Sequence, residues 1–177
     1  KKWHETHSAE FYVSINVSDE QFAFGNLTEM LQALLEEYNL PPHCLRIEIT
    51  ETVLMADVFG GMSQLDELKR LGIRILIDDF GTGFSSLSHL ATIPAETIKI
   101  DRSFVHGLKP NTKNFEIVRT ILALSKNLHL GAVAEGIETA EERQLLTELG
   151  CEFGQGYLFA APMPPVDAEV LLSMQKA

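Results

Sequence analysis

Hydrophobic and polar positions along the chain alternate between short apolar runs and longer stretches with helical spacing. Six runs rich in β-branched and aliphatic residues predict strands at residues 11–18, 45–51, 75–79, 97–101, 131–135 and 151–159. Apolar residues three or four positions apart predict helices at 27–38, 59–71, 117–125 with an end near Gly131, 139–149 and 166–171, and a short helix with Leu87 and Leu90, and their apolar faces are expected to be core. Gly72 is expected to end the helix at 59–71, and Thr139 and Glu142 are expected to form a capping box. Strand and helix alternate six times, which predicts an α/β fold with a parallel sheet and helices outside.

Polar side chains stand at the carboxyl end of every predicted strand. In chain order they are Asn16, Glu48 and Glu51, Asp78 and Asp79, Lys99 and Asp101, Glu135 and Glu138, and Gln155. A doubly wound open sheet gathers its site at one switch point, whereas a barrel brings all strand ends to one mouth. The pattern favours a TIM-type (β/α)8 barrel with about six of eight βα units in this chain; the open sheet is the alternative.

The apolar run that begins at Ile75 ends in the adjacent acids Asp78 and Asp79 and a glycine-rich loop. Burying two acids at the end of a strand costs free energy unless cations or hydrogen-bond donors lie beside them. Carboxylates with one amide oxygen and no clustered histidine or cysteine suit Mg²⁺, Mn²⁺ or Ca²⁺ rather than structural zinc. The sequence therefore predicts an oxygen-rich metal site at the mouth of the barrel.

Adjacent acids allow one carboxylate to bridge two ions about 3.5–4 Å apart while the other carboxylate binds one ion. That arrangement suits in-line hydrolysis of a phosphodiester. Lys99, kept charged by neighbouring acids, is expected to orient the attacking water or to neutralise developing charge.

Length and charge narrow the class of protein. The 177 residues are most simply one domain, and the net charge of −11 gives no general attraction for DNA, RNA or an anionic membrane. No apolar run reaches membrane-spanning length and residues 1–7 are not a signal peptide, so a cytoplasmic protein with a solvated N-terminal tail is expected. Cys44 and Cys151 lack a CxxC spacing, which favours two buried, reduced thiols over a disulfide.

Five motifs occur in a defined order: EITE at 48–51, DDFGTGFSSL at 78–87, IKID at 98–101, EGIET at 135–139 and GQGY at 154–157. Together with SINVS at 14–18, they closely resemble the motifs of EAL-domain cyclic di-GMP phosphodiesterases. The resemblance covers nearly the whole chain, so residues 1–177 are expected to be one such domain. It implies a barrel that hydrolyses cyclic di-GMP to linear pGpG in bacterial signalling, with two Mg²⁺ or Mn²⁺ ions and with Ca²⁺ inhibitory if bound.

The resemblance also implies roles for individual residues. Asn16, Glu48 and Asp78 would bind one metal, Asp78 would bridge, and Asp79 with Glu135 would serve the other. Lys99 would hold the catalytic water, with Gln155 near that water or the substrate. Glu51 would brace the loop after Asp79, and Asp101 and Glu138 would support the site.

One family motif is absent. No Glu-Ala-Leu, whose glutamate binds metal, occurs in this sequence, and it would lie on a strand upstream of Lys1. The chain is therefore expected to be an N-terminally truncated domain that is less active than a longer protein with the upstream residues. The resemblance further implies a homodimer and an upstream sensory or GGDEF-type domain.

Other functions remain open. A related module that binds cyclic di-GMP without cleaving it is the main alternative, although such modules usually have eroded metal ligands and these residues are intact. A metal-dependent lyase or aldolase would need a Schiff-base lysine or more histidines at the mouth. The Asp79-Phe80-Gly81 triplet alone is discounted as a kinase signature because its partner motifs are missing.

Overall fold

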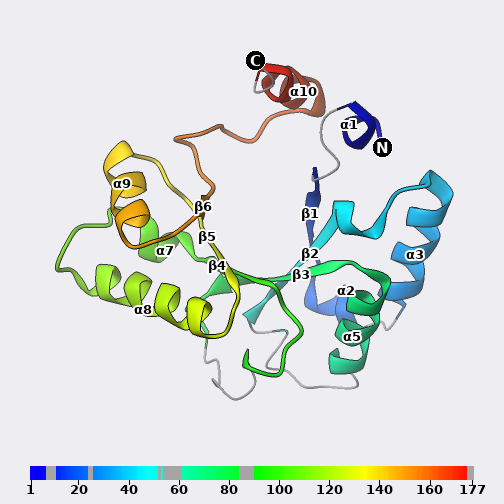
Figure 1. Cartoon of the computed structure of the whole chain (residues 1–177), viewed down its shortest axis with the longest axis horizontal. Helices are drawn as coiled ribbons and strands as arrows, with labels where there is room; N and C mark the ends of the chain where they lie inside the picture. Colours follow the sequence, from blue (N-terminus) through cyan, green and yellow to red (C-terminus); the bar gives the residue numbers. More distant parts are fainter. Residues whose placement is uncertain (7–10, 24–25, 52, 54–60, 84–89, 175–177) are drawn as a thin grey trace.

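The computed structural model describes residues 1–6, 11–23, 26–51, 53, 61–83 and 90–174. Six parallel strands form one curled sheet, in which each strand pairs with the next one along the chain (Figure 1). The strands are β1 (Val13–Asn16), β2 (Leu45–Thr50), β3 (Arg74–Phe80), β4 (Thr97–Ile100), β5 (Gly131–Ala134) and β6 (Phe153–Gly154). This open part of a TIM-type barrel contains about six of the eight βα units and confirms the predicted fold class.

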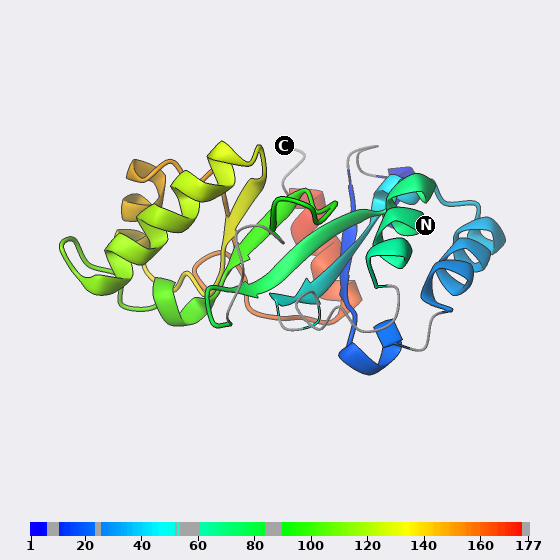
Figure 2. The same cartoon turned by 90° about the horizontal axis from the view of Figure 1, so that it is seen from below.

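Helices lie between the strands along the chain, with one helix before the first strand and one after the last. They are α1 (Lys2–Thr6), α2 (Asp19–Ala23), α3 (Leu27–Tyr38), α5 (Gly61–Leu71), α7 (Arg102–Val105), α8 (Lys113–Asn127), α9 (Ala140–Glu148) and α10 (Pro165–Met174), with a 3₁₀ turn, η1, at Pro42–Cys44. Helices α3 and α5 lie at one end of the sheet, and α8 and α9 lie at the other (Figure 2). Among the described residues, no helix has the length and apolar character needed to cross a membrane.

Isoleucines on alternate positions of the central strands form the core between sheet and helices. Six of them are at most 1% exposed: Ile47, Ile49, Ile75, Ile77, Ile98 and Ile100. They pack with Leu65 and Leu68 of α5 and with Val118 of α8. Because successive side chains of a strand point to opposite faces, the residues between these isoleucines line the inner face of the sheet.

Most predicted elements are confirmed, with shorter ends. The predicted last strand is reduced to two residues, because the chain turns at Gly156, whose carbonyl accepts a hydrogen bond from Phe159 N–H at 3.0 Å. The predicted helix thought to continue close to Gly131 ends at Asn127, and His129 then adopts a left-handed backbone with φ of 58°. The predicted short helix with Leu87 lies largely outside the described residues.

Helix ends follow the sequence signals in two cases. Thr139 and Glu142 form the expected capping box at the start of α9. Gly72, with φ of 89°, ends α5, where Ile73 N–H donates to Leu68 C=O at 3.1 Å.

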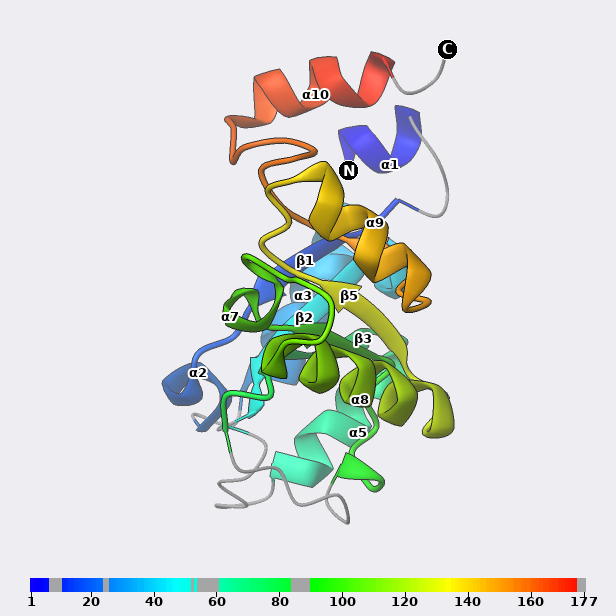
Figure 3. The same ribbon diagram turned by 90° about the vertical axis from the view of Figure 1, so that its left-hand side faces the viewer.

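Two expectations about the termini are wrong. Residues 2–6 form helix α1 rather than a solvated tail, and Lys2 Nζ lies 2.7 Å from Glu169 of α10. The two helices lie side by side (Figure 3). The apolar residues of α10 are not core, since Val166 is 73% and Met174 is 70% exposed. An apolar pattern alone does not say whether another element covers it.

Candidate metal centre and active site

Three carboxylates meet where β3 and β5 end. Asp78, Asp79 and Glu135 each offer an oxygen, and these oxygens all lie within 4.8 Å of one another. Asp78 and Asp79 are the fifth and sixth residues of β3, and Glu135 follows the last residue of β5. The carboxyl ends of the strands thus bring acids from separate chain segments into one group.

A local irregularity in β3 allows both adjacent aspartates to join this group. Consecutive strand residues normally point to opposite faces. Here the pairing with β4 shifts register between Ile77 and Phe80, and Asp79 adopts a left-handed backbone with φ of 51°. Aspartate tolerates this backbone better than most residues because its short side chain can hydrogen-bond locally. The bulge therefore turns Asp79 toward the same mouth as Asp78.

Lys99 is the cation at the centre of the site. Its Nζ lies 2.5 Å from Glu48 Oε2, 2.8 Å from Asp78 Oδ1 and 2.8 Å from Glu135 Oε1. Burial lowers the pKa of Lys99, but hydrogen bonds to Asp78, Glu135 and Glu48 outweigh it and raise the pKa above its usual value. Lys99 therefore stays protonated and acts as a hydrogen-bond donor.

Asn16 lies beside these carboxylates, at the end of the first strand. The register of β1 on β2 places Asn16 opposite Glu48. With its amide nitrogen turned toward the acids, Asn16 donates to Glu48 Oε2 at 3.2 Å and to Asp78 Oδ2 at 3.3 Å. The Asn16 side chain thus reaches the acids of the site. With its amide turned the other way, it presents its oxygen to them instead of its nitrogen.

The site has more negative charge than Lys99 can neutralise. Burial raises the pKa of Asp79, and the nearby Asp78 and Asp101 raise it further. Burial also raises the pKa of Glu135 beyond the opposing effect of its contacts with Lys99. A divalent cation would relieve this excess charge, and an oxygen-only donor set fits Mg²⁺ or Mn²⁺.

Glu51 lies behind the site, against the loop that follows β3. This carboxylate is 2% exposed and accepts hydrogen bonds from Gly81 N at 3.0 Å and, more weakly, from Gly83 N at 3.4 Å. Glycine suits both positions. Gly81 has φ of 99°, and a Cβ on Gly83 would lie 2.9 Å from Glu51 Oε1. Glu51 thus connects the end of β2 to residues 81–83.

The remaining predicted site residues are less central. Asp101 caps α7 by accepting hydrogen bonds from the Ser103 amide, at 3.0 Å, and from its hydroxyl, and it also neighbours Asp79. Glu138 faces α7 instead, where it pairs with Arg102. Gln155 is exposed after β6, and its backbone N–H donates to Ala134 C=O at 2.8 Å.

A separate cavity lies away from this site. It measures about 630 Å³ and lies at the opposite end of the inner face, near Arg46, Arg74 and Glu96. Arg46 packs over the Tyr12 ring, 3.2 Å from its centroid. The convergence of titratable groups, rather than cavity volume, identifies the candidate site.

Sequence reasoning missed the residues that connect this site to its surroundings. Arg102 and His106 contact Glu138, and Glu142 was assigned only to the helix cap. Nothing in the sequence indicated the contacts of Arg102 and His106. The capping box did indicate that Glu142 points back toward the loop after β5, but not its second contact.

This chain is similar to several known proteins. The EAL domain family model matches residues 1–162. The signaling protein YkoW of Bacillus subtilis is 40% identical over 98% of this chain and 22% of its own length. The cyclic di-GMP phosphodiesterase RocR of Pseudomonas aeruginosa is 40% identical over 86% of this chain and 39% of its own length. The chain thus spans well under half of these relatives.

Solved structures show the same fold. The PaMucR phosphodiesterase in complex with c-di-GMP has a TM-score of 0.89 and 38% identity, covering 94% of this chain and 72% of that chain. Klebsiella pneumoniae BlrP1 with manganese and cyclic di-GMP has a TM-score of 0.80 and 30% identity, covering 86% of this chain and 39% of that chain.

Proposed function

Because this chain belongs to the EAL domain family, we propose that it is the main part of a metal-dependent domain that hydrolyses cyclic di-GMP to linear pGpG. The observation that carries the proposal is the group formed by Asp78, Asp79 and Glu135 around the charged Lys99. The relatives and structures named for cyclic di-GMP support the substrate.

The acidic residues fit two divalent ions. Asn16, Glu48 and Asp78 would hold one ion, Asp79 and Glu135 would hold the other, and Asp78 would serve both. The BlrP1 structure with manganese supports metal binding by such a domain. When bound, two such ions activate water and neutralise charge around the phosphorus of an in-line displacement.

The reaction cleaves one of the two phosphodiester bonds of the ring. The oxygen of water forms a new bond to phosphorus, the bond from phosphorus to the 3′ oxygen breaks, and that oxygen leaves as a hydroxyl. The product is a linear dinucleotide with a 5′ phosphate. Lys99 is protonated in this structure and donates hydrogen bonds. It orients the water and neutralises charge.

The loop after Asp79 completes the site. Glu51 holds residues 81–83 through backbone hydrogen bonds, so the position of this loop is coupled to Asp79, two residues before Gly81. Asp101 and Gln155 act as neighbours of the site that support substrate or water.

The test is direct. The protein that contains this chain is incubated with cyclic di-GMP and Mn²⁺, and the products are separated by chromatography. We expect linear pGpG, no product after chelation, and no product from Asp78→Asn at unchanged circular dichroism. Binding of cyclic di-GMP without product would favour the non-cleaving module, and no binding would exclude both functions.

The surrounding protein is also part of the proposal. The chain spans 22% of YkoW and 39% of RocR, which supports further domains, sensory or GGDEF-type, in the full-length protein. We propose a cytoplasmic homodimer for that protein. Light scattering of the full-length protein measures the oligomeric state, and a monomer at micromolar concentration would contradict the dimer.

A further inference from the structure

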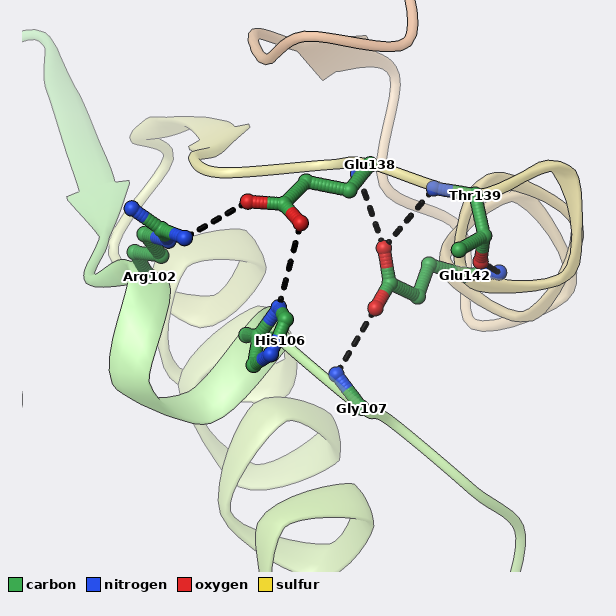
Figure 4. A network of polar contacts seen from close by, with 6 residues as sticks. All are labelled: Arg102, His106, Gly107, Glu138, Thr139 and Glu142. Atoms are coloured by element: carbon green, nitrogen blue, oxygen red, sulfur yellow. Dashed lines mark hydrogen bonds and ion pairs between the residues drawn. The ribbon is translucent and has the colours of Figure 1, made fainter.

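The loop after β5 carries Glu135 and is tied to the segment after β4 by a polar network outside the acidic group (Figure 4). The loop contributes Glu138 and Thr139. Helix α7 and the residue after its C-cap contribute Arg102, His106 and Gly107. Figure 4 shows Glu142 of α9 between these two segments. Glu135 therefore precedes one of two segments that contact each other, and Lys99 precedes the other.

Glu142 is a buried carboxylate, 4% exposed, and both of its oxygens have partners. Oε2 accepts from the backbone amides of Glu138 at 2.8 Å and Thr139 at 3.1 Å. Oε1 accepts from the amide of Gly107 at 2.7 Å. Burial raises the pKa of Glu142, but these amides outweigh it, so the pKa lies below its usual value.

A capping box accounts for only part of this arrangement. In a capping box the glutamate reaches back to the amide of the capping residue, here Thr139. The bond to Gly107 spans 35 positions of sequence and adds nothing to the cap of α9. Gly107 lies just beyond α7, eight positions after Lys99, so this bond ties the loop after β5 to the segment that follows Lys99.

Arg102 makes a second contact between the same two segments. Its guanidinium lies 2.6 Å from Glu138 Oε1, and His106 Nδ1 lies 3.6 Å from Glu138 Oε2. The stem of Arg102 also packs on Gly136, where an added Cβ would lie 2.2 Å from Arg102 Cγ. The Arg102 stem is therefore in close contact with the loop at Gly136.

The loop is also held from the side of β6. The Ile137 amide donates to Gln155 C=O at 3.1 Å, and Ile137 C=O accepts from Leu158 N–H at 3.0 Å. Residues 135–139 thus lie between α7 and the segment after β6. The buried Glu142 carboxylate is their charged contact to Gly107, just after α7.

We propose that Glu142 is a positioning residue: by holding Gly107 against the loop of residues 135–139, it sets where Glu135 stands relative to Lys99. This inference rests on the proposed function for its kinetic consequences. Outer contacts that orient a metal ligand typically change metal affinity or activity about 10- to 100-fold when removed. Glu142 touches none of the reacting atoms and acts through Glu135.

The test compares Glu142→Ala with the protein that contains this chain. We expect a fall in kcat of about 10- to 100-fold, little change in KM, and weaker Mn²⁺ binding by calorimetry without substrate. Glu142→Gln keeps one side-chain oxygen, so it can accept hydrogen bonds from the backbone amides of only one of the two segments. It should give an intermediate loss, and it serves as the test variant if Glu142→Ala does not fold.

Thr139→Ala is the matched control. It removes the other half of the capping box, where Thr139 Oγ1 accepts from the Glu142 amide at 3.2 Å, and leaves Gly107 bound. We expect a lower Tm with unchanged kcat and Mn²⁺ affinity. If both Glu142 variants also have a lower Tm with unchanged kcat and Mn²⁺ affinity, Glu142 is a helix cap and the proposal is wrong. An inactive parent protein contradicts the proposed function alone, because Mn²⁺ affinity still decides the role of Glu142.

Discussion

The Lys99 ammonium and the Glu48 carboxylate form an ion pair of 2.5 Å although β3 lies between their strands. Their side chains are 6% and 10% exposed. A flat sheet would hold strands β2 and β4 almost 10 Å apart, since neighbouring strands lie about 4.8 Å from each other. The long side chains and the curl of the sheet close this gap, so that Lys99 reaches acids from three strands.

Removal of this lysine is expected to destabilise the protein. Lys99→Met leaves Glu48, Asp78 and Glu135 without their shared cation, and loss of one partner of a buried pair costs about 3–5 kcal/mol. Urea unfolding without metal measures the loss. Mn²⁺ should restore part of it. The exposed Lys126→Met is the control and should change the unfolding free energy by less than about 0.5 kcal/mol. Equal stability of the two variants would contradict the central role of Lys99.

Mn²⁺ or Mg²⁺ should stabilise the folded protein. A ligand that binds only the folded state adds about 2.7 kcal/mol when its concentration is 100 times Kd. Differential scanning calorimetry should therefore show Tm rising with Mn²⁺ and returning after chelation. Asp79→Asn should weaken this response, because Asp79 belongs to the acidic group. A Tm insensitive to Mn²⁺ would argue against a metal centre.

The loop after β3 should depend on Glu51. Glu51→Gln keeps the size of the side chain but removes the charge that accepts from the Gly81 amide. Charge-assisted hydrogen bonds are roughly twice as strong as neutral ones, so we expect kcat to fall about 10-fold by analogy with other supporting residues. Steady-state kinetics measure the effect. Glu37→Gln, on the exposed face of α3, is the control, and wild-type kcat in both variants would separate Glu51 from catalysis.

Glu142 should make stability depend on pH in acid. Its pKa is lower in the folded protein than in the unfolded chain, so the unfolded chain binds its proton first as pH falls. The stabilisation is full well above the ordinary glutamate pKa of 4.5 and is lost as pH falls through the lower folded pKa. The unfolding free energy of wild type minus that of Glu142→Gln should therefore shrink from pH 7 to pH 3. A difference independent of pH would contradict the ionised, amide-bound carboxylate.

The neighbours of Glu135 could be predicted only in part. The motifs indicated that Glu48, Asp78, Lys99 and Glu135 stand at strand ends, and parallel strands bring such ends to one side. The joint position of Asp78 and Asp79 required a register shift and a positive φ that no periodicity reveals. Glu138 shows the opposite case: its motif position suggested the site, yet its carboxylate pairs with Arg102.

The sequence by itself determined the strand and helix order, the barrel class and the family, because period and motif are local properties of the chain. Only the tertiary structure decided which side chains meet. The second bond of Glu142 to Gly107 joins positions 35 residues apart, and the three partners of Lys99 come from β2, β3 and the residue after β5. Such contacts depend on sheet curvature and loop path, which arise from packing over the whole molecule rather than from the pattern of any one segment.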